Sequence, residues 1–207
     1  MEIKICGITD VDEVDVLNNM RPDYIGFVFA ESKRKVSKEE AETLCKLVNK
    51  DIKVIGVFRN NTKEFIEEVL KKVPLHAIQL HGSEESEFIQ YFNDNYHCEV
   101  WKGQSINNKK DLEEALKLPV STLILDSKNP GSGKVFSWEL LEGIKTDKKI
   151  FLAGGINTEN ISEAVKINNI QGIDISSGVE SVVKGIRRKD PIKIEKIIKK
   201  VREKHEG

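Results

Sequence analysis

The sequence contains little cysteine and no long hydrophobic run. Its three cysteines, Cys6, Cys45 and Cys98, are odd in number and widely spaced, so they predict neither a disulfide framework nor a CxxC metal site. No stretch approaches the ~20 apolar residues of a membrane span. The charges of Glu2 and Lys4 lie where a signal peptide would begin its apolar segment. We therefore expect a reduced, cytoplasmic protein.

An excess of charge of either sign is also missing. The 207 residues include 33 Lys and Arg and 34 Asp and Glu, which gives a net charge of -1. Proteins that bind nucleic acids or anionic membranes need a basic face. Local basic runs occur, for example at residues 184–190, but acidic residues elsewhere offset them. No nucleic-acid partner and no membrane partner is therefore expected.

Short apolar or β-branched runs alternate with longer amphipathic segments along the whole chain. Within residues 37–50, for example, Ala41, Leu44, Cys45 and Val48 recur at helical spacing. The predicted strands lie within residues 3–8, 24–29, 53–58, 76–80, 98–102, 121–126, 149–155 and 172–178. The predicted helices lie within residues 10–20, 37–50, 62–73, 83–92, 107–118, 137–144, 157–167 and 190–204.

Three of these helices carry signals at their first residues. Thr62 is a predicted N-cap, and Ser83, which Glu84, Glu85 and Glu87 follow, is close to a capping box. Pro191 falls in the first turn of the closing helix, where proline is tolerated. These signals support the helical assignment of the amphipathic segments.

Eight strand–helix pairs without a linker predict one α/β domain over residues 1–207, a (β/α)8 TIM barrel. Apolar strands alternating with helices indicate a parallel sheet that helices cover, and the length suits a single barrel. An open doubly wound sheet is the alternative. Its usual markers, GxGxxG after the first strand or GxxxxGK[ST], are absent.

Chemistry in such barrels lies at the carboxyl ends of the strands. Cys6 ends the first predicted strand and Asp126 ends the sixth. A lone cysteine is more often a small buried hydrophobe, but Gly7 follows Cys6 and would leave space for a ligand. Asp126 could cap the next loop, or it could be a site acid whose charged form apolar surroundings disfavour. Both residues are candidates for proton transfer.

The ends of the seventh and eighth strands have the composition of a phosphate site. Gly154 and Gly155 follow the seventh strand, and Ser176, Ser177 and Gly178 follow the eighth. Glycines let backbone N–H groups approach an anion, and serines add hydroxyl donors. Residues 178–181 could add a short helix. Tight turns are the alternative explanation, but barrels commonly bind phosphate at these two loops.

Three further polar residues follow strands that face the same end. Arg34 could grip a carboxylate, although a solvated basic loop explains its neighbours equally well. Gln79 and His81 end the fourth strand, and His81 could be a hydrogen-bonding wall or a base. No second histidine or acid is spaced to complete a metal site, so no metal is expected.

Together these stretches resemble the phosphoribosylanthranilate isomerase family of tryptophan biosynthesis. The match spans almost the whole chain, and the combination of KICGIT with SSGVE is specific. The matching segments, in family order, are KICGIT, GFVF, SKRKV, VIGVF, IQLHG, LILDS, GSGKVFSW, LAGGINTEN and DISSGVES.

The resemblance implies an Amadori rearrangement of a phosphorylated aminosugar, without a cofactor. Cys6 would be the general base and Asp126 the general acid, and the surroundings of Cys6 would favour its thiolate, with help from a nearby arginine. Arg34 would bind the anthranilate carboxylate. The pocket would be lined by Gln79 and His81, and the phosphate would be held by Gly154, Gly155, Ser176, Ser177 and Gly178.

Two segments depart from the family pattern. Only residues 127–130 separate Asp126 from the GSGK segment, so the loop expected to cover the site is short. Residues 182–190 are longer and more basic than the usual stretch. Neither departure touches the expected acid or base.

Other readings of the same barrel remain open. These are another phosphosugar enzyme, such as a pentose-phosphate epimerase or indole-glycerol-phosphate synthase, an isomerase that also accepts the related histidine-pathway aminoaldose, and a non-catalytic phosphate-binding protein. Both a monomer and a homodimer are compatible with the sequence.

Overall fold

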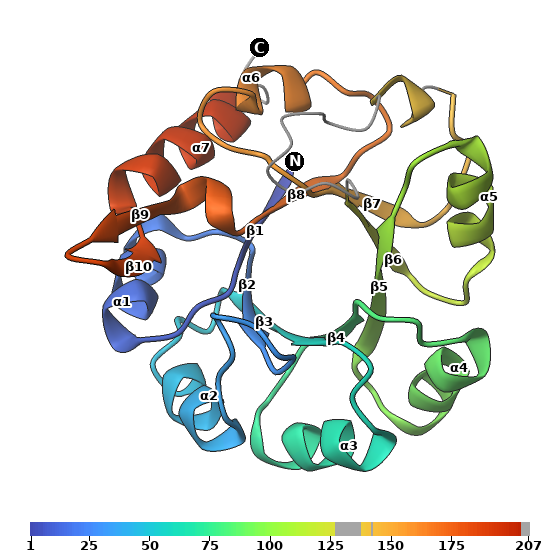
Figure 1. The fold of residues 1–207 in the computed structure, drawn as a ribbon, viewed down its shortest axis with the longest axis horizontal. Helices are drawn as coiled ribbons and strands as arrows, with labels where there is room; N and C mark the ends of the chain where they lie inside the picture. The colour runs from blue at the N-terminus through green and yellow to red at the C-terminus, as the bar shows by residue number, and fades with distance from the viewer. Residues whose placement is uncertain (127–137, 142, 204–207) are drawn as a thin grey trace.

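The computed structural model describes residues 1–126, 138–141 and 143–203 and has a closed barrel of eight parallel strands (Figure 1). The strands are β1 (Glu2–Cys6), β2 (Tyr24–Val28), β3 (Lys53–Phe58), β4 (Ala77–Leu80), β5 (Glu99–Ser105), β6 (Thr122–Asp126), β7 (Lys149–Leu152) and β8 (Gly172–Ile175). Pairing of β1 with β8 closes the ring. The predicted (β/α)8 barrel is confirmed, and the open sheet is excluded.

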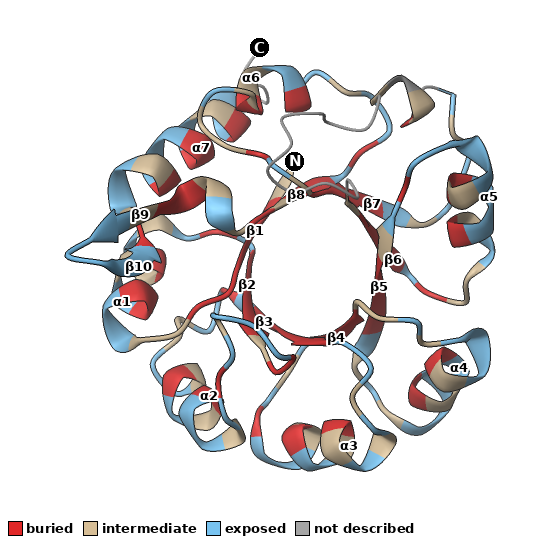
Figure 2. Cartoon of the chain, in the orientation of Figure 1, coloured by how far each residue is buried: buried red, intermediate tan, exposed pale blue. Residues whose placement is uncertain are grey.

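Helices surround the strands and turn their buried faces inward (Figure 2). They are α1 (Val11–Met20), α2 (Lys38–Cys45), α3 (Lys63–Lys72), α4 (Ser86–Asn95), α5 (Lys109–Lys117), α6 (Ile161–Ala164) and α7 (Pro191–Glu203), with the 3-10 helices η1 (Trp138–Leu141) and η2 (Ser177–Val179). Residues 127–137, which include most of the loop expected to cover the site, lie outside the described residues.

Local capping explains where several of these helices begin. Thr62 accepts a hydrogen bond from the backbone N–H of Phe65 and is the N-cap of α3, as predicted. The expectation for Ser83 is wrong, because α4 starts only after Glu85. Ser83 instead donates its backbone N–H to Asn60 Oδ1 at 2.8 Å, a bond that holds the β4–α4 loop away from helical geometry.

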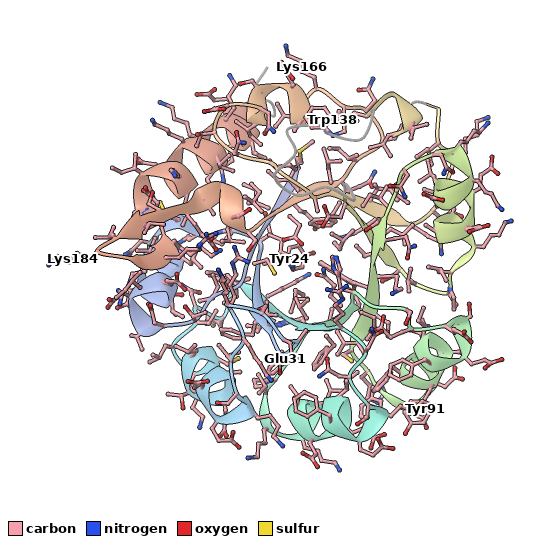
Figure 3. All side chains as sticks on the ribbon, in the orientation of Figure 1. Tyr24, Glu31, Tyr91, Trp138, Lys166 and Lys184 are labelled. Carbon is pink, nitrogen blue, oxygen red and sulfur yellow. The ribbon has the colours of Figure 1, made fainter. Side chains whose placement is uncertain are left out.

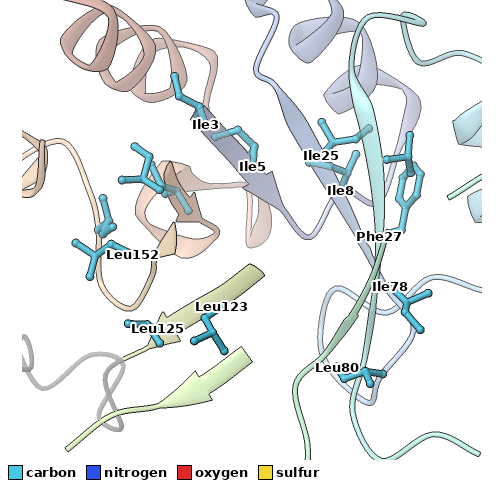
Figure 4. Packing of buried hydrophobic residues seen from close by; sticks show 14 of the residues in the cluster. Ile3, Ile5, Ile8, Ile25, Phe27, Ile78, Leu80, Leu123, Leu125 and Leu152 are labelled. Carbon is cyan, nitrogen blue, oxygen red and sulfur yellow. The ribbon is translucent and has the colours of Figure 1, made fainter. Parts of the chain in front are cut away.

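Alternation along each strand sorts its side chains between two cores. Ile3 and Ile5 of β1 point outward and pack between strands and helices (Figure 4). A second, smaller cluster fills the inside of the barrel, where the rings of Tyr24 and Phe151 lie 5.0 and 5.3 Å from that of Trp101. This inner cluster leaves the space above it, at the carboxyl ends of the strands, for a site.

A β-hairpin occupies the segment that departs from the family pattern. Strands β9 (Glu180–Val183) and β10 (Ile186–Lys189) pair antiparallel between β8 and α7. Lys184 and Gly185 turn with φ of 52° and 80°, the left-handed pair that a tight two-residue hairpin needs. Lys184 lies at its outer tip (Figure 3). No helix among the described residues is long and apolar enough to cross a membrane.

Burial of one face of α7 should contribute strongly to stability. Ile197 is fully buried, whereas Ile192 on the same helix is 65% exposed. Ile197→Ala should lower the free energy of unfolding by about 2–5 kcal/mol, and Ile192→Ala should change it by less than about 0.5 kcal/mol. Urea unfolding followed by circular dichroism measures both. Equal effects of the two substitutions would contradict the packing of this helix.

Candidate active site

A cavity of about 260 Å³ opens at the carboxyl ends of the strands. It brings together all ten residues that sequence analysis singled out. Those residues are Cys6, Arg34, Gln79, His81, Asp126, Gly154, Gly155, Ser176, Ser177 and Gly178. Parallel pairing explains this, because it places the end of every strand at the same rim of the barrel.

Cys6 is the last residue of β1 and is only 9% exposed. Ser176 donates its hydroxyl to the Cys6 carbonyl oxygen at 2.9 Å, which ties the end of β1 to the loop after β8. Gly7 turns the chain with a φ of 83°. The space beside Gly7 does not serve a ligand as expected, because a Cβ there would overlap Cδ of Arg34.

Burial raises the pKa of the Cys6 thiol. The positive charges of Lys4 and Lys189 act in the opposite direction, and the negative charge of Asp174 adds to the rise. The expectation that the surroundings would favour the thiolate is therefore wrong for the ligand-free site. Desolvation of a nearly closed site outweighs the cations beside it.

His81 and Asp126 face each other across the cavity, with 3.9 Å between His81 Nε2 and Asp126 Oδ2. Gln79 Nε2 donates to His81 Nδ1 at 3.3 Å. Since an amide nitrogen only donates, Nδ1 accepts and the ring proton of the neutral tautomer lies on Nε2. Burial lowers the pKa of His81, so the neutral ring prevails at pH 7.

Arg34 lines the cavity but is already paired with a carboxylate of the chain. Its Nε and Nη2 donate to the two oxygens of Glu180 at 2.6 and 2.8 Å. Lys189 Nζ and Arg187 Nη1 reach the same carboxylate at 2.9 and 3.3 Å. Burial alone would raise the pKa of Glu180, but Arg34 and Lys189 outweigh burial and lower it to about 2. Arg34 is thus held in one orientation at the rim.

The two glycine- and serine-rich loops lie against each other. Gly154 and Gly155 have φ of 82° and 74°, which an L side chain rarely adopts. A Cβ on Gly178 would overlap the carbonyl oxygen of Ile156, so the loops after β7 and β8 are in direct contact. The short helix expected over residues 178–181 begins one residue earlier as η2, and Glu180 already belongs to β9.

Three charged residues of the site escaped sequence analysis. Lys4 and Asp174 pair inside the barrel, with 2.9 Å between Nζ and Oδ2, and Glu180 anchors Arg34. For Lys4 and Asp174 the sequence does carry a signal. Each is a charged residue inside an apolar strand and lies two residues from one that faces the inside of the barrel, so its own side chain faces inside as well. Among the described residues, no three His, Cys, Asp or Glu side chains gather closely enough to hold a metal ion.

Comparison with known proteins matches the chain to one family of enzymes. The family model for N-(5'-phosphoribosyl)anthranilate (PRA) isomerase matches residues 3–200. The N-(5'-phosphoribosyl)anthranilate isomerase of Thermoanaerobacter sp. strain X514 is 39% identical over 206 residues, which cover 98% of each chain.

Solved structures agree with this match. The crystal structure of phosphoribosyl anthranilate isomerase from Thermotoga maritima has a TM-score of 0.89 at 33% identity, over 98% of this chain and 99% of that one. A further phosphoribosyl anthranilate isomerase, in complex with reduced 1-(o-carboxyphenylamino)-1-deoxyribulose 5-phosphate, has a TM-score of 0.86 at 31% identity, with coverage of 98% and 99%.

Ionisation of Glu180 should make stability depend on pH. Its pKa falls from 4.5 to about 2 on folding, so its contribution is complete above about pH 4.5 and is lost as the pH falls toward 2. A shift of this size corresponds to roughly 3 kcal/mol. Urea unfolding should therefore show a difference between wild type and Glu180→Gln that is largest near pH 6 and shrinks by about pH 3. A difference that stays constant over this range would refute the assignment.

Proposed function

The chain belongs to the N-(5'-phosphoribosyl)anthranilate isomerase family, and on that premise we propose that it performs this reaction in tryptophan biosynthesis. The substrate would be N-(5'-phosphoribosyl)anthranilate and the product 1-(2-carboxyphenylamino)-1-deoxyribulose 5-phosphate. One observation carries the proposal. A thiol and a carboxyl, Cys6 and Asp126, end two strands on the wall of one cavity that two contacting glycine- and serine-rich loops also line.

Asp126 is the proposed general acid. In its protonated form it would donate to the furanose ring oxygen, so that the C1′–O bond breaks and the anilino nitrogen forms an iminium. His81 presents its Nε2 to the same carboxyl. Its neutral ring adds no positive charge beside the proposed acid.

Cys6 is the proposed general base. Its thiolate would take the proton from C2′, the C–H electrons would form the C1′–C2′ double bond, and the iminium would become a neutral enolamine. Tautomerisation of the enolamine then gives the ketose. Proton transfer between carbons needs only an acid, a base and a site that limits water. Cys6 is a base here and not a covalent nucleophile.

Arg34 would bind the anthranilate carboxylate through the donors that Glu180 does not use. Glu180 takes Nε and one hydrogen of Nη2, so the Nη1 edge is the one to meet a substrate. A guanidinium fixed in this way loses little conformational freedom on binding. Glu180 therefore orients Arg34 without filling its whole fork.

Both catalytic roles can be tested by conservative substitutions. Cys6→Ser and Asp126→Asn should each lower kcat by at least ~100-fold, the usual effect of losing a general acid or base. The assay follows the fluorescence of N-(5'-phosphoribosyl)anthranilate generated in situ. Cys45→Ser is the control, because Cys45 lies on α2 outside the cavity, and it should retain wild-type activity.

The outcomes separate the remaining alternatives. A Cys6→Ser variant of unchanged kcat would place the base elsewhere. A wild-type protein that binds the reduced product analogue without any turnover would instead be a phosphate-ligand binding protein. Turnover of the histidine-pathway aminoaldose alone would assign the chain to that reaction.

Contact between the two loops should determine phosphate affinity. In Gly178→Ala the new methyl would push against the Ile156 carbonyl and part the loops after β7 and β8. We expect KM to rise by about tenfold, the effect of one weakened charge-assisted hydrogen bond, while kcat changes much less. Ile192→Ala, at an exposed position of α7 outside the cavity, is the control. A fall in kcat at constant KM would argue against a phosphate role for these loops.

A further inference from the structure

Lys4 is a charged residue at a position where the packing of the barrel interior favours an apolar side chain. It lies in the middle of β1, two residues before Cys6, so the two side chains share the inner face of the barrel. Its side chain is completely buried. Burying an ammonium is costly unless it is paired, so packing of the core does not explain why a lysine occupies this position.

Asp174 pairs with Lys4 directly across the seam that closes the barrel. The register places Lys4 opposite Asp174, and their Nζ and Oδ2 atoms are 2.9 Å apart. The Asp174 side chain is only 9% exposed and lines the cavity. Within the described part of the chain its Oδ1 has no hydrogen-bond partner. The pair is therefore not a closed structural unit, since it borders the site.

Lys4 and Cys6 also meet at Gly26 of the neighbouring strand. A Cβ on Gly26 would lie 2.9 Å from Cys6 Sγ and 3.3 Å from Lys4 Nζ. The sulfur and the ammonium thus flank the same small volume, which only glycine leaves free. A charge on Cys6 would form beside the ammonium with little water between them.

The other charged groups that face Cys6 are Asp174, Lys189 and Arg34. Lys189 and Arg34 are both engaged by Glu180, at 2.9 and 2.6 Å. Asp174 opposes ionisation of the thiol. Lys4, by contrast, shares the small volume beside Gly26 with the Cys6 sulfur, so its ammonium lies next to the thiol.

We propose that Lys4 is a positioning residue for the base, an ammonium that Asp174 holds beside Cys6 as the counter-ion of its thiolate. The proposal rests on the function proposed above for Cys6. In the free site Lys4 is bound to Asp174. When the thiol loses its proton to solvent, Lys4 is shared between the carboxylate and the sulfur. When the thiolate takes the C2′ proton, the S–H bond forms and Lys4 returns to Asp174 alone.

Two substitutions that remove opposite charges should shift the pH at which Cys6 is alkylated in opposite directions. Lys4→Met removes the cation and should raise the pH at which Cys6 reacts with iodoacetamide by at least one unit, a tenfold loss of thiolate at a given pH. Asp174→Asn leaves the ammonium uncompensated and should lower that pH. Both are made in a Cys45→Ser, Cys98→Ser background, so that Cys6 is the only thiol. If Lys4 and Asp174 had only a structural role, removing one or the other would not shift the alkylation pH in opposite directions.

A double variant that lacks both charges controls for unfolding caused by an unpaired buried charge. Lys4→Met alone leaves a buried, unpaired carboxylate, which costs several kcal/mol. Lys4→Met with Asp174→Asn removes both charges and should still react at a higher pH than Asp174→Asn alone. The control is Lys102→Met with Glu84→Gln, a comparable buried pair at 2.8 Å between β5 and the loop after β4, which should leave Cys6 unchanged.

Turnover separates this inference from the proposed function. In Lys4→Met and in the double variant, kcat should fall at least tenfold with KM within about twofold, and the acidic limb of the kcat/KM profile should move up with the alkylation pH. If the wild type is active and the Lys4 variants keep both the wild-type alkylation pH and the wild-type kcat, the proposed role of Lys4 is wrong. Opposite shifts in alkylation without any wild-type turnover would support the ion contact and refute the isomerase function.

Discussion

Closure of the barrel between β1 and β8 is the constraint on which the site depends. This seam places Lys4 opposite Asp174 and continues into the bond from Ser176 to the Cys6 carbonyl. A slip of one residue would turn Lys4 and Cys6 outward and bring Ile5 into the barrel. The seam therefore joins the proposed base, its proposed counter-ion and the start of the proposed phosphate loop through strand-to-strand hydrogen bonds and the hydrogen bond from the Ser176 hydroxyl.

Charge pairing at a second place continues this arrangement around the rim. Glu180 gathers Arg34, Arg187 and Lys189 from the β2–α2 loop and the hairpin. Three cations around one carboxylate leave local positive charge, which suits a cavity whose proposed ligand carries a carboxylate and a phosphate. The hairpin that departs from the family pattern thus contributes to the site through β9 and β10, although it lies outside the barrel.

The fold and most of the site followed from the sequence because they depend on local patterns. Strand ends are visible as apolar runs that stop at Cys6 or Asp126, and parallel pairing gathers such ends at one rim without further information. The Asn60 bond that delays α4 past Ser83 joins residues 23 apart in sequence, and no local capping signal reveals it.

Lys4, Asp174 and Glu180 escaped for a related reason. Each matters through a partner on another element, and the partner is known only once the register is known. The direction of the Cys6 pKa also depends on burial, which spacing alone does not give. Resemblance pointed to Cys6 as the base, but only the structure showed how deeply Cys6 is buried.

A buried general base, the role proposed for Cys6, faces a conflict that the position of its proposed counter-ion resolves. Burial keeps the thiol neutral at rest and protects it from solvent, yet the reaction needs a thiolate. A cation on a loop, such as Arg34, could stabilise the thiolate only if the loop held it in place. Arg34 is already paired with Glu180. A cation two residues earlier on the same strand moves with the sulfur as one unit. Lys4 therefore stabilises the thiolate that forms when the Cys6 thiol loses its proton to solvent, and this thiolate is the form that takes the C2′ proton once the substrate's iminium makes that proton acidic. Asp174 limits the field of Lys4 at the sulfur.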